Sequence, residues 1–134
     1  DFDVLSTASA MFGVSLTAVA LRWIRSTPES ALLILSRDGF IDWAVSSDKA
    51  RSNGAFFRTK GRVVQLPAAT MAADDSVSAC RAGKNISLRS WFEHAHADAS
   101  AREMKLTCEN YGYTLTLLHL SPGDKVWEPR AWGA

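Results

Sequence analysis

Two histidines and two carboxylates fall within six residues, in the segment Glu93-His94-Ala95-His96-Ala97-Asp98. Imidazole and carboxylate groups are common ligands of divalent metals. On a strand His94 and His96 would share a face, and in a loop they could converge. The segment is rich in alanine and joins two predicted strands, so a solvated loop is the favoured interpretation. His94 and His96 are therefore weak metal candidates, and we expect no cofactor in this chain.

The sequence also lacks the common catalytic motifs. There is no H-E-x-x-H zinc motif, no G-x-S-x-G nucleophile turn and no glycine-rich phosphate loop. Cys80 and Cys108 have no neighbouring residues that would activate a thiol, and free thiols are favoured over a disulfide between them. We therefore predict no catalytic residue and expect that this chain is not an enzyme.

Residues 8–25 carry a pattern typical of a helix-turn-helix. Gly13 lies in the predicted turn, and the small residues Ala8 and Ser9 allow two helices to cross closely. In that arrangement the second helix would enter a DNA groove, and its candidate contact residues are Ser15, Thr17, Arg22 and Arg25. The alternative is a helical hairpin whose second helix packs on a sheet. That alternative is favoured, because the second helix is strongly apolar.

The amino-terminal segment therefore predicts two helices. Residues 3–12 can form the first, and Ser15 is expected to cap the second, because its hydroxyl can accept a hydrogen bond from a first-turn N–H. Apolar residues then recur at helical spacing and form one stripe: Leu16, Val19, Ala20, Trp23 and Ile24. Residues 27–29 (Thr-Pro-Glu) end the helix, and we expect Trp23 and Ile24 to be buried against a sheet.

The rest of the chain reads mainly as strands. Residues 31–36 and 40–45 flank Asp38-Gly39 and predict a β-hairpin with Phe40, Asp42 and Ala44 on one face. The further predicted elements are a helical turn within 46–54, a strand at 61–66, a helix at 74–81 ended by Gly83, and strands at 86–92, 101–109 and 113–120. Consecutive strands with short helical inserts predict an α+β fold with an antiparallel sheet. The predicted domains are a helical segment, 1–27, and a sheet domain, 28–134.

Composition excludes several classes of protein. With 134 residues, 47% hydrophobic and 22% charged, the chain has the make-up of a single globular domain. Its 15 basic and 14 acidic residues give a net charge of +1, without the basic excess of a typical nucleic-acid binder, although a local basic patch is left open. No apolar run is long enough to span a membrane and no signal peptide is recognisable, so a cytoplasmic location is expected.

Several ordered motifs resemble the ImmA/IrrE family of metallopeptidases. The first part of the resemblance is the stretch from Leu5 to Trp23, which includes Phe12-Gly-Val-Ser15, followed by residues 27–29 and by residues 36–43 (Ser-Arg-Asp-Gly-Phe-Ile-Asp-Trp). Later matches are Trp91-Phe92, the strand around Glu103, residues 111–118 and the closing residues 127–130 (Trp-Glu-Pro-Arg). The resemblance covers nearly the whole chain.

Members of that family carry an amino-terminal zinc peptidase domain, a helix-turn-helix-like segment and, in the IrrE branch, a GAF-like domain. Because the zinc motif is missing, the resemblance implies that this chain is the portion after the peptidase, with an N-terminal helix pair and a GAF-like sheet. It carries over no catalytic residue or zinc ligand. It implies bacterial stress-response or transcription regulation, with the peptidase domain and a repressor protein or small ligand as partners.

Two functions of different classes follow from these observations. The first is a non-catalytic sensor or protein-interaction module, which predicts a concave pocket with polar groups around an apolar floor. The second is a DNA-binding regulator that uses the helix at 15–25, which requires that helix to be exposed beside clustered basic residues. We expect weak DNA binding or none, and pairing of two chains is left open.

Overall fold

A computed structural model describes residues 5, 15–108 and 111–121. One antiparallel sheet of six strands forms its centre, in the order β3-β2-β1-β6-β5-β4. The strands are β1 (Ala31–Arg37), β2 (Phe40–Ser46), β3 (Val64–Gln65), β4 (Ala79–Ser87), β5 (Ser100–Cys108) and β6 (Tyr113–Leu120). The helices are α2 (Leu16–Ser26), α3 (Asp48–Ser52) and the 3-10 turn η1 (Leu88–Ser90). The predicted α+β class with an antiparallel sheet is confirmed.

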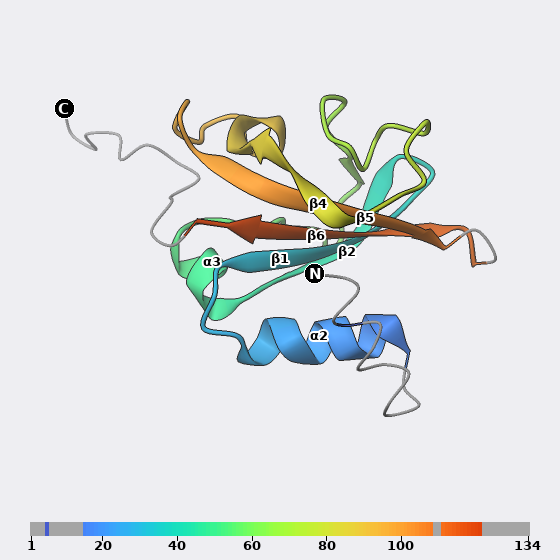
Figure 1. Ribbon diagram of the computed structural model, residues 1–134, viewed down its shortest axis with the longest axis horizontal. Coiled ribbons are helices and arrows are strands. Elements are labelled where there is room, and N and C mark those ends of the chain that lie inside the picture. Colours follow the sequence, from blue (N-terminus) through green and yellow to red (C-terminus); the bar gives the residue numbers. More distant parts are fainter. Residues whose placement is uncertain (1–4, 6–14, 109–110, 122–134) are drawn as a thin grey trace.

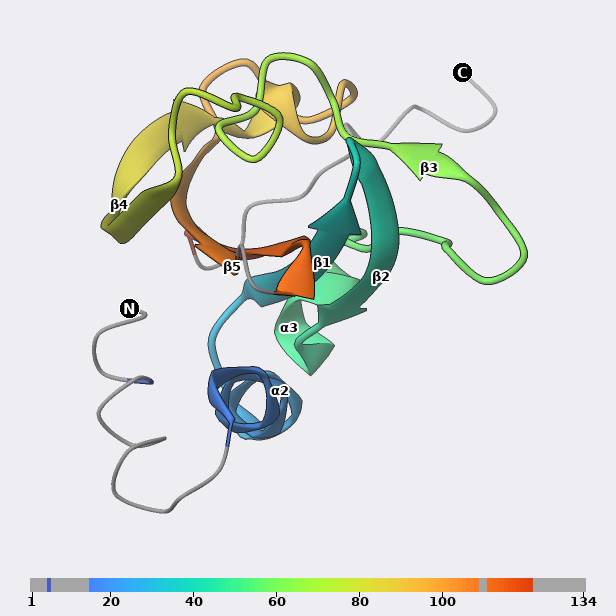
Figure 2. The ribbon, with the colours of Figure 1, turned by 90° about the vertical axis from the view of Figure 1, so that its right-hand side faces the viewer.

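The sheet is strongly curved and has a core on each face. Helix α2 lies beneath one face, while η1 and the long loops around β3 and β4 lie over the other (Figure 1, Figure 2). Side chains alternate along the central strands, so that Leu33 of β1 faces α2 and Leu32 faces the loops. The two cores therefore share one sheet, and the loop-covered core is the one that can hold a site.

Helix α2 agrees with the sequence prediction in its cap and its apolar stripe. The Oγ of Ser15 accepts a hydrogen bond from the N–H of Ala18 at 3.1 Å. Ala20 and Ile24 are fully buried, whereas Trp23 is only half-buried against the same core. Trp23 therefore contacts the core as predicted, but it is only partly buried. The helix ends at Ser26, and Thr27 is its C-cap, at the position where residues 27–29 were predicted to end it.

The β1–β2 hairpin is confirmed, but one of its faces differs from the prediction. Asp38 and Gly39 both have positive φ angles, 51° and 82°, as a tight two-residue hairpin turn requires. The register shifts between Leu35 and Ser36, so the alternation of side chains on β2 is interrupted. Ile41 and Ala44 consequently pack in the same core. The prediction that Phe40 and Ala44 share a face is wrong.

The predicted helix at 74–81 is wrong. The carboxylate of Asp74 accepts hydrogen bonds from both the N–H and the hydroxyl of Ser76, a local turn that competes with helix formation. From Ala79 onward the chain pairs with β5, and Gly83, with φ +91°, lies within a bulge of β4. The predicted strand at 86–92 is also wrong beyond Ser87, because η1 follows there.

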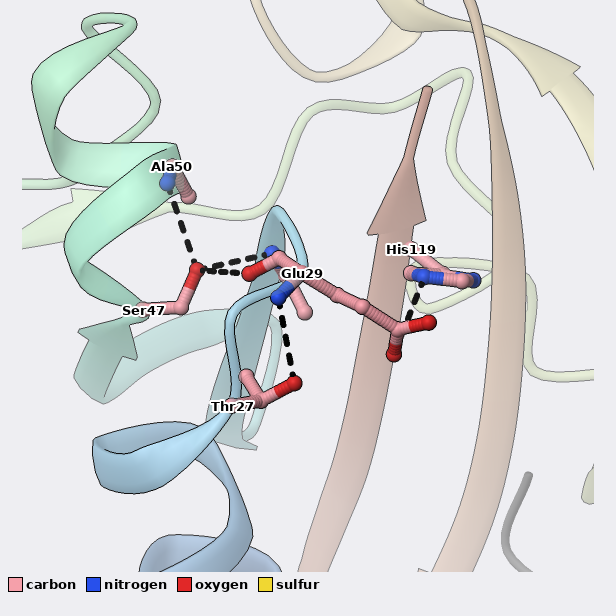
Figure 3. Close-up of polar contacts among 6 residues, drawn as sticks. Thr27, Glu29, Ser47, Ala50 and His119 are labelled. Atoms are coloured by element: carbon pink, nitrogen blue, oxygen red, sulfur yellow. Dashed lines mark hydrogen bonds and ion pairs between the residues drawn. The ribbon is translucent and has the colours of Figure 1, made fainter. Parts of the chain in front are cut away.

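A buried serine ties the end of the hairpin to the start of β1 (Figure 3). The Oγ of Ser47 donates to the carbonyl of Glu29 at 2.7 Å and accepts from the N–H groups of Ala31, at 3.0 Å, and Ala50, at 3.2 Å. It therefore caps α3, which confirms the helical turn predicted within 46–54. On the outside of this junction His119 Nε2 lies 3.5 Å from Glu29 Oε2.

Two parts of the sequence interpretation lie largely outside the described residues. They are the first predicted helix, at 3–12, and with it the helix pair, and the closing residues 127–130 of the resemblance. The boundary at residues 27 and 28 stays a prediction. Within the described parts of the chain no helix has the length and apolar character needed to cross a membrane.

Candidate functional site

A hollow of about 470 Å³ opens on the loop-covered side of the sheet. Its walls come from three segments that are distant in sequence. Gly54 follows α3, Pro67 follows β3, and the third wall is the end of η1 with the loop behind it, residues 89–94. A pocket built from loops over a rigid sheet is a common place for a ligand.

The rings of Trp91 and Phe92 form the floor of this hollow, and Phe57, which is not part of its lining, packs against both. Phe57 stacks on Phe92 with ring centroids 4.8 Å apart, and it meets the edge of Trp91 at 6.0 Å. Trp91 is only 4% exposed and Phe92 is half-buried. Edge-to-face and offset contacts of this kind stabilise a ring cluster beyond simple burial. The floor is therefore apolar and held in place from below.

The floor is anchored by a buried carboxylate. Glu103 of β5 is fully buried, and its Oε1 accepts a hydrogen bond from the indole Nε1 of Trp91 at 3.0 Å. The N–H of Met71 donates to the same oxygen at 3.3 Å, and the N–H of Ala72 donates to Oε2 at 2.7 Å. A buried carboxylate needs such donors to offset its loss of hydration. Glu103 thus fixes Trp91 and the loop at 71–72 to one point of the sheet.

Lys105, two residues further along β5, holds the same loop through its carbonyl groups. Its Nζ donates to the carbonyl of Met71 at 3.0 Å and to that of Asp74 at 2.8 Å. Burial lowers the pKa of Lys105, and the nearby carboxylates of Asp75, Asp74 and Glu103 act in the opposite direction. Glu103 thus accepts hydrogen bonds from two N–H groups of this loop, and Lys105 donates to two of its carbonyl groups.

The rim of the hollow is polar and solvated. Glu93 and His94 both line it, and their side chains are 85% and 79% exposed, with His94 Nε2 3.4 Å from Glu93 Oε1. Arg89 also lines it and donates through Nε to the carbonyl of Ala95 at 2.6 Å. Ser90 lines the hollow as well.

The two metal candidates do not share a ligand set. His94 lies beside Glu93, whereas His96 is turned to Asp98, whose N–H donates to its Nδ1 at 3.1 Å. Across the part of the chain that the structure describes, no three His, Cys, Asp or Glu side chains are grouped closely enough to hold a metal ion. The segment forms a turn-rich loop, in agreement with the favoured interpretation.

The DNA candidates lie on α2, on the far side of the sheet from the hollow. Ser15, Arg22 and Arg25 are exposed, and Thr17 is half-buried. The opposite side of the helix is occupied by core contacts, which is the packing that the helical-hairpin alternative requires for its second helix. Arg22 and Arg25 thus leave only two cations on the outer surface of this helix.

Sequence reasoning missed the residues that build the hollow. Glu103 and Lys105 alternate on β5 and resemble an exposed face, and their partners lie more than ten residues away. Cys80 and Cys108 are free thiols, as predicted, and both are half-buried. The only sequence signal for the site was Trp91-Phe92 directly before Glu93.

No protein-family model matches the chain, and a search of curated proteins finds no match.

Proposed function

We propose that this chain is a non-catalytic sensor or protein-interaction module, and that it acts beside a zinc peptidase domain of the ImmA/IrrE type in a cytoplasmic regulator. One observation carries the sensor part of the proposal. The hollow of about 470 Å³ has an aromatic floor and a rim of charged and polar side chains, on a sheet whose other face is covered by α2. This is the pocket expected of a ligand sensor. A curved antiparallel sheet with loops over one face is also compatible with a GAF-like domain.

The pocket favours a small ligand with a flat apolar part and a polar end. Phe92 and Trp91 provide the apolar surface, and Glu93 and His94 stand where a polar end would leave the hollow. A volume of this size is within the range of pockets for small molecules. Such a ligand would bind between segments that Glu103 and Lys105 hold, so binding would stiffen the loop at 67–74.

The proposal is tested by screening a library of small aromatic compounds by their effect on the melting temperature and on NMR signals of the chain. We expect hits whose binding is lost in Phe92→Ala and weakened in His94→Ala. His94 is largely exposed, so its removal leaves the fold intact. Phe40→Ala, which removes an exposed ring outside the hollow, is the matched control. Hits that bind both pocket variants as they bind the wild type would contradict the proposal.

The absence of catalysis is part of the same proposal. We expect no peptidase or esterase activity from the chain, with or without added zinc. The informative variant is His94→Ala/His96→Ala, which removes both imidazoles of the 93–98 segment. Zinc-dependent hydrolysis that disappears in this variant would refute the non-catalytic assignment.

A DNA-binding regulator is the second candidate, and one observation favours it. Ser15, Arg22 and Arg25 are all exposed on α2 while its other side packs on the sheet, so the helix could be presented to a groove. Against it, two arginines neutralise few phosphates. The salt titration described in the Discussion distinguishes the two candidates.

A further inference from the structure

The charge of this chain is unevenly distributed. Residues 49–73 contain five cations, Lys49, Arg51, Arg58, Lys60 and Arg62, and no aspartate or glutamate. The rest of the chain then holds ten basic and fourteen acidic residues, a net charge of −4, although the whole chain carries +1. A local concentration of one sign attracts partners of the opposite sign even when the total charge is small.

The structure exposes all five of these cations. Lys49 and Arg51 belong to α3, and the other three belong to the loop between α3 and β3. That loop projects away from the sheet before it enters β3 (Figure 2). Among the described residues no carboxylate lies within ion-pair distance of any of the five. We call these residues, 49–51 and 58–62, the basic surface.

Two guanidinium groups on this surface are held near one ring. The Cζ of Arg51 lies 5.2 Å and that of Arg58 5.9 Å from the ring centroid of Phe56. Cation–π contacts reduce the freedom of both side chains. Two like charges are thereby held around one ring, and no carboxylate of the described residues pairs with either, so both can accept an incoming carboxylate.

Apolar side chains adjoin the basic surface. Val63, the residue directly before β3, is 84% exposed. Phe40, the first residue of β2, is 44% exposed. Both line an open hollow of about 450 Å³ together with Arg62 and Arg37. Exposed apolar side chains beside cations suggest contact with a partner that offers both an anion and an apolar group.

We propose that the basic surface binds a short acidic segment of a partner protein, with carboxylates on Arg51, Arg58 and Arg62 and an apolar side chain against Phe40 and Val63. A nucleic acid fits less well. The rest of the chain has a net charge of −4, so a long polyanion would extend from the basic surface onto repelling charge. The ring of Phe56 already contacts two guanidinium groups, which would compete with a base for stacking on it. This inference does not depend on the aromatic hollow.

The test uses the chain itself and a fluorescent peptide in which glutamates alternate with leucines. We expect saturable binding that weakens with added salt and becomes about tenfold weaker in Arg58→Glu/Arg62→Glu. Arg22→Glu/Arg25→Glu changes the net charge equally on exposed positions of α2 and is the matched control, which should bind as the wild type does. Val63→Ser removes the apolar contact without changing the charge, and it should also weaken binding.

Specific outcomes would overturn the proposal. Equal binding by wild type and Arg58→Glu/Arg62→Glu would exclude the basic surface as the binding site. A peptide of alternating glutamate and serine that binds as tightly as the leucine peptide would exclude the apolar contact. A DNA duplex that displaces the fluorescent peptide at a lower concentration, counted in negative charges, than unlabelled peptide does would assign the surface to nucleic acid. Melting curves of all variants check that the exposed substitutions leave the fold intact.

Discussion

The indole Nε1 of Trp91 donates a hydrogen bond to Oε1 of Glu103, 3.0 Å away, inside the core. Both groups are buried, and the second carboxylate oxygen accepts from the N–H of Ala72. One side chain on β5 therefore connects the floor of the aromatic hollow with the loop over it. The stability of the hollow and its shape depend on the same carboxylate.

The first prediction concerns this carboxylate. Glu103→Gln replaces one acceptor oxygen with an N–H₂ group that faces N–H donors, so we expect a loss of about 2–3 kcal/mol in the free energy of unfolding. Urea denaturation measures it. Glu93→Gln is the control, because that side chain is 85% exposed, and its effect should stay within about 0.5 kcal/mol. Equal effects of the two substitutions would contradict the role given to Glu103.

The second prediction concerns the junction at Ser47. Ser47→Ala leaves the buried N–H of Ala31 without its side-chain acceptor and removes the cap of α3, so we expect a loss of about 1–3 kcal/mol. Ser52→Ala, an exposed serine of the same helix that donates to the carbonyl of Lys49, is the matched control. A Ser47→Ala protein that unfolds at the wild-type urea concentration would show that the junction is not stabilising.

The third prediction concerns DNA. Arg22 and Arg25 can neutralise about two phosphates per chain, so binding through α2 should show a log–log salt slope of about −2 and be weak at physiological salt. The measurement is a salt titration of binding to duplex DNA, for the wild type and Arg22→Ala. Tight binding with a steep slope that Arg22→Ala reduces would favour the DNA-binding regulator instead of the sensor module.

The fourth prediction concerns pH. Burial lowers the pKa of Lys105 in the folded chain, so between that value and the higher value of the unfolded chain the unfolded state binds more protons. The contribution of Lys105 to stability is therefore least favourable at neutral pH and rises with pH through that alkaline interval. The free energy of unfolding of the wild type minus that of Lys105→Met should increase as the pH rises toward about 10.5, the ordinary pKa of a lysine. A difference that is constant or falls with pH would contradict the assigned direction.

The sequence predicted the local elements well because their signals are short in range. The cap at Ser15, the stripe that buries Ile24, the Asp38-Gly39 turn and the β5–β6 pair all depend on neighbouring residues. The prediction of a helix at 74–81 was also wrong for a local reason. The carboxylate of Asp74 accepts two hydrogen bonds from Ser76, and this turn competes with a helix in a way that the spacing of apolar residues does not reveal.

The candidate site was largely beyond sequence reasoning. The role of Glu103 depends on Met71, Ala72 and Trp91, which approach it only when the sheet curves and the loops fold over it. A carboxylate and an amine at alternate positions of a strand are ordinarily a solvated face. The basic surface is different, because the absence of any acidic residue from 49–73 is visible in the sequence, whereas its exposure required the fold.

The bulge in β4 affects whether this edge of the sheet can pair with a strand of another copy. A Cβ at Gly83 would lie 2.7 Å from the Cγ of Arg102, so the strand can bend there only with glycine, and the pairing with β5 shifts between Cys80 and Lys84. The outer side of β4 is therefore irregular, and the opposite edge, β3, has only two residues. Neither edge offers the long flat row of N–H and C=O groups on which a second sheet could grow, which protects this strand-rich chain from open-ended aggregation.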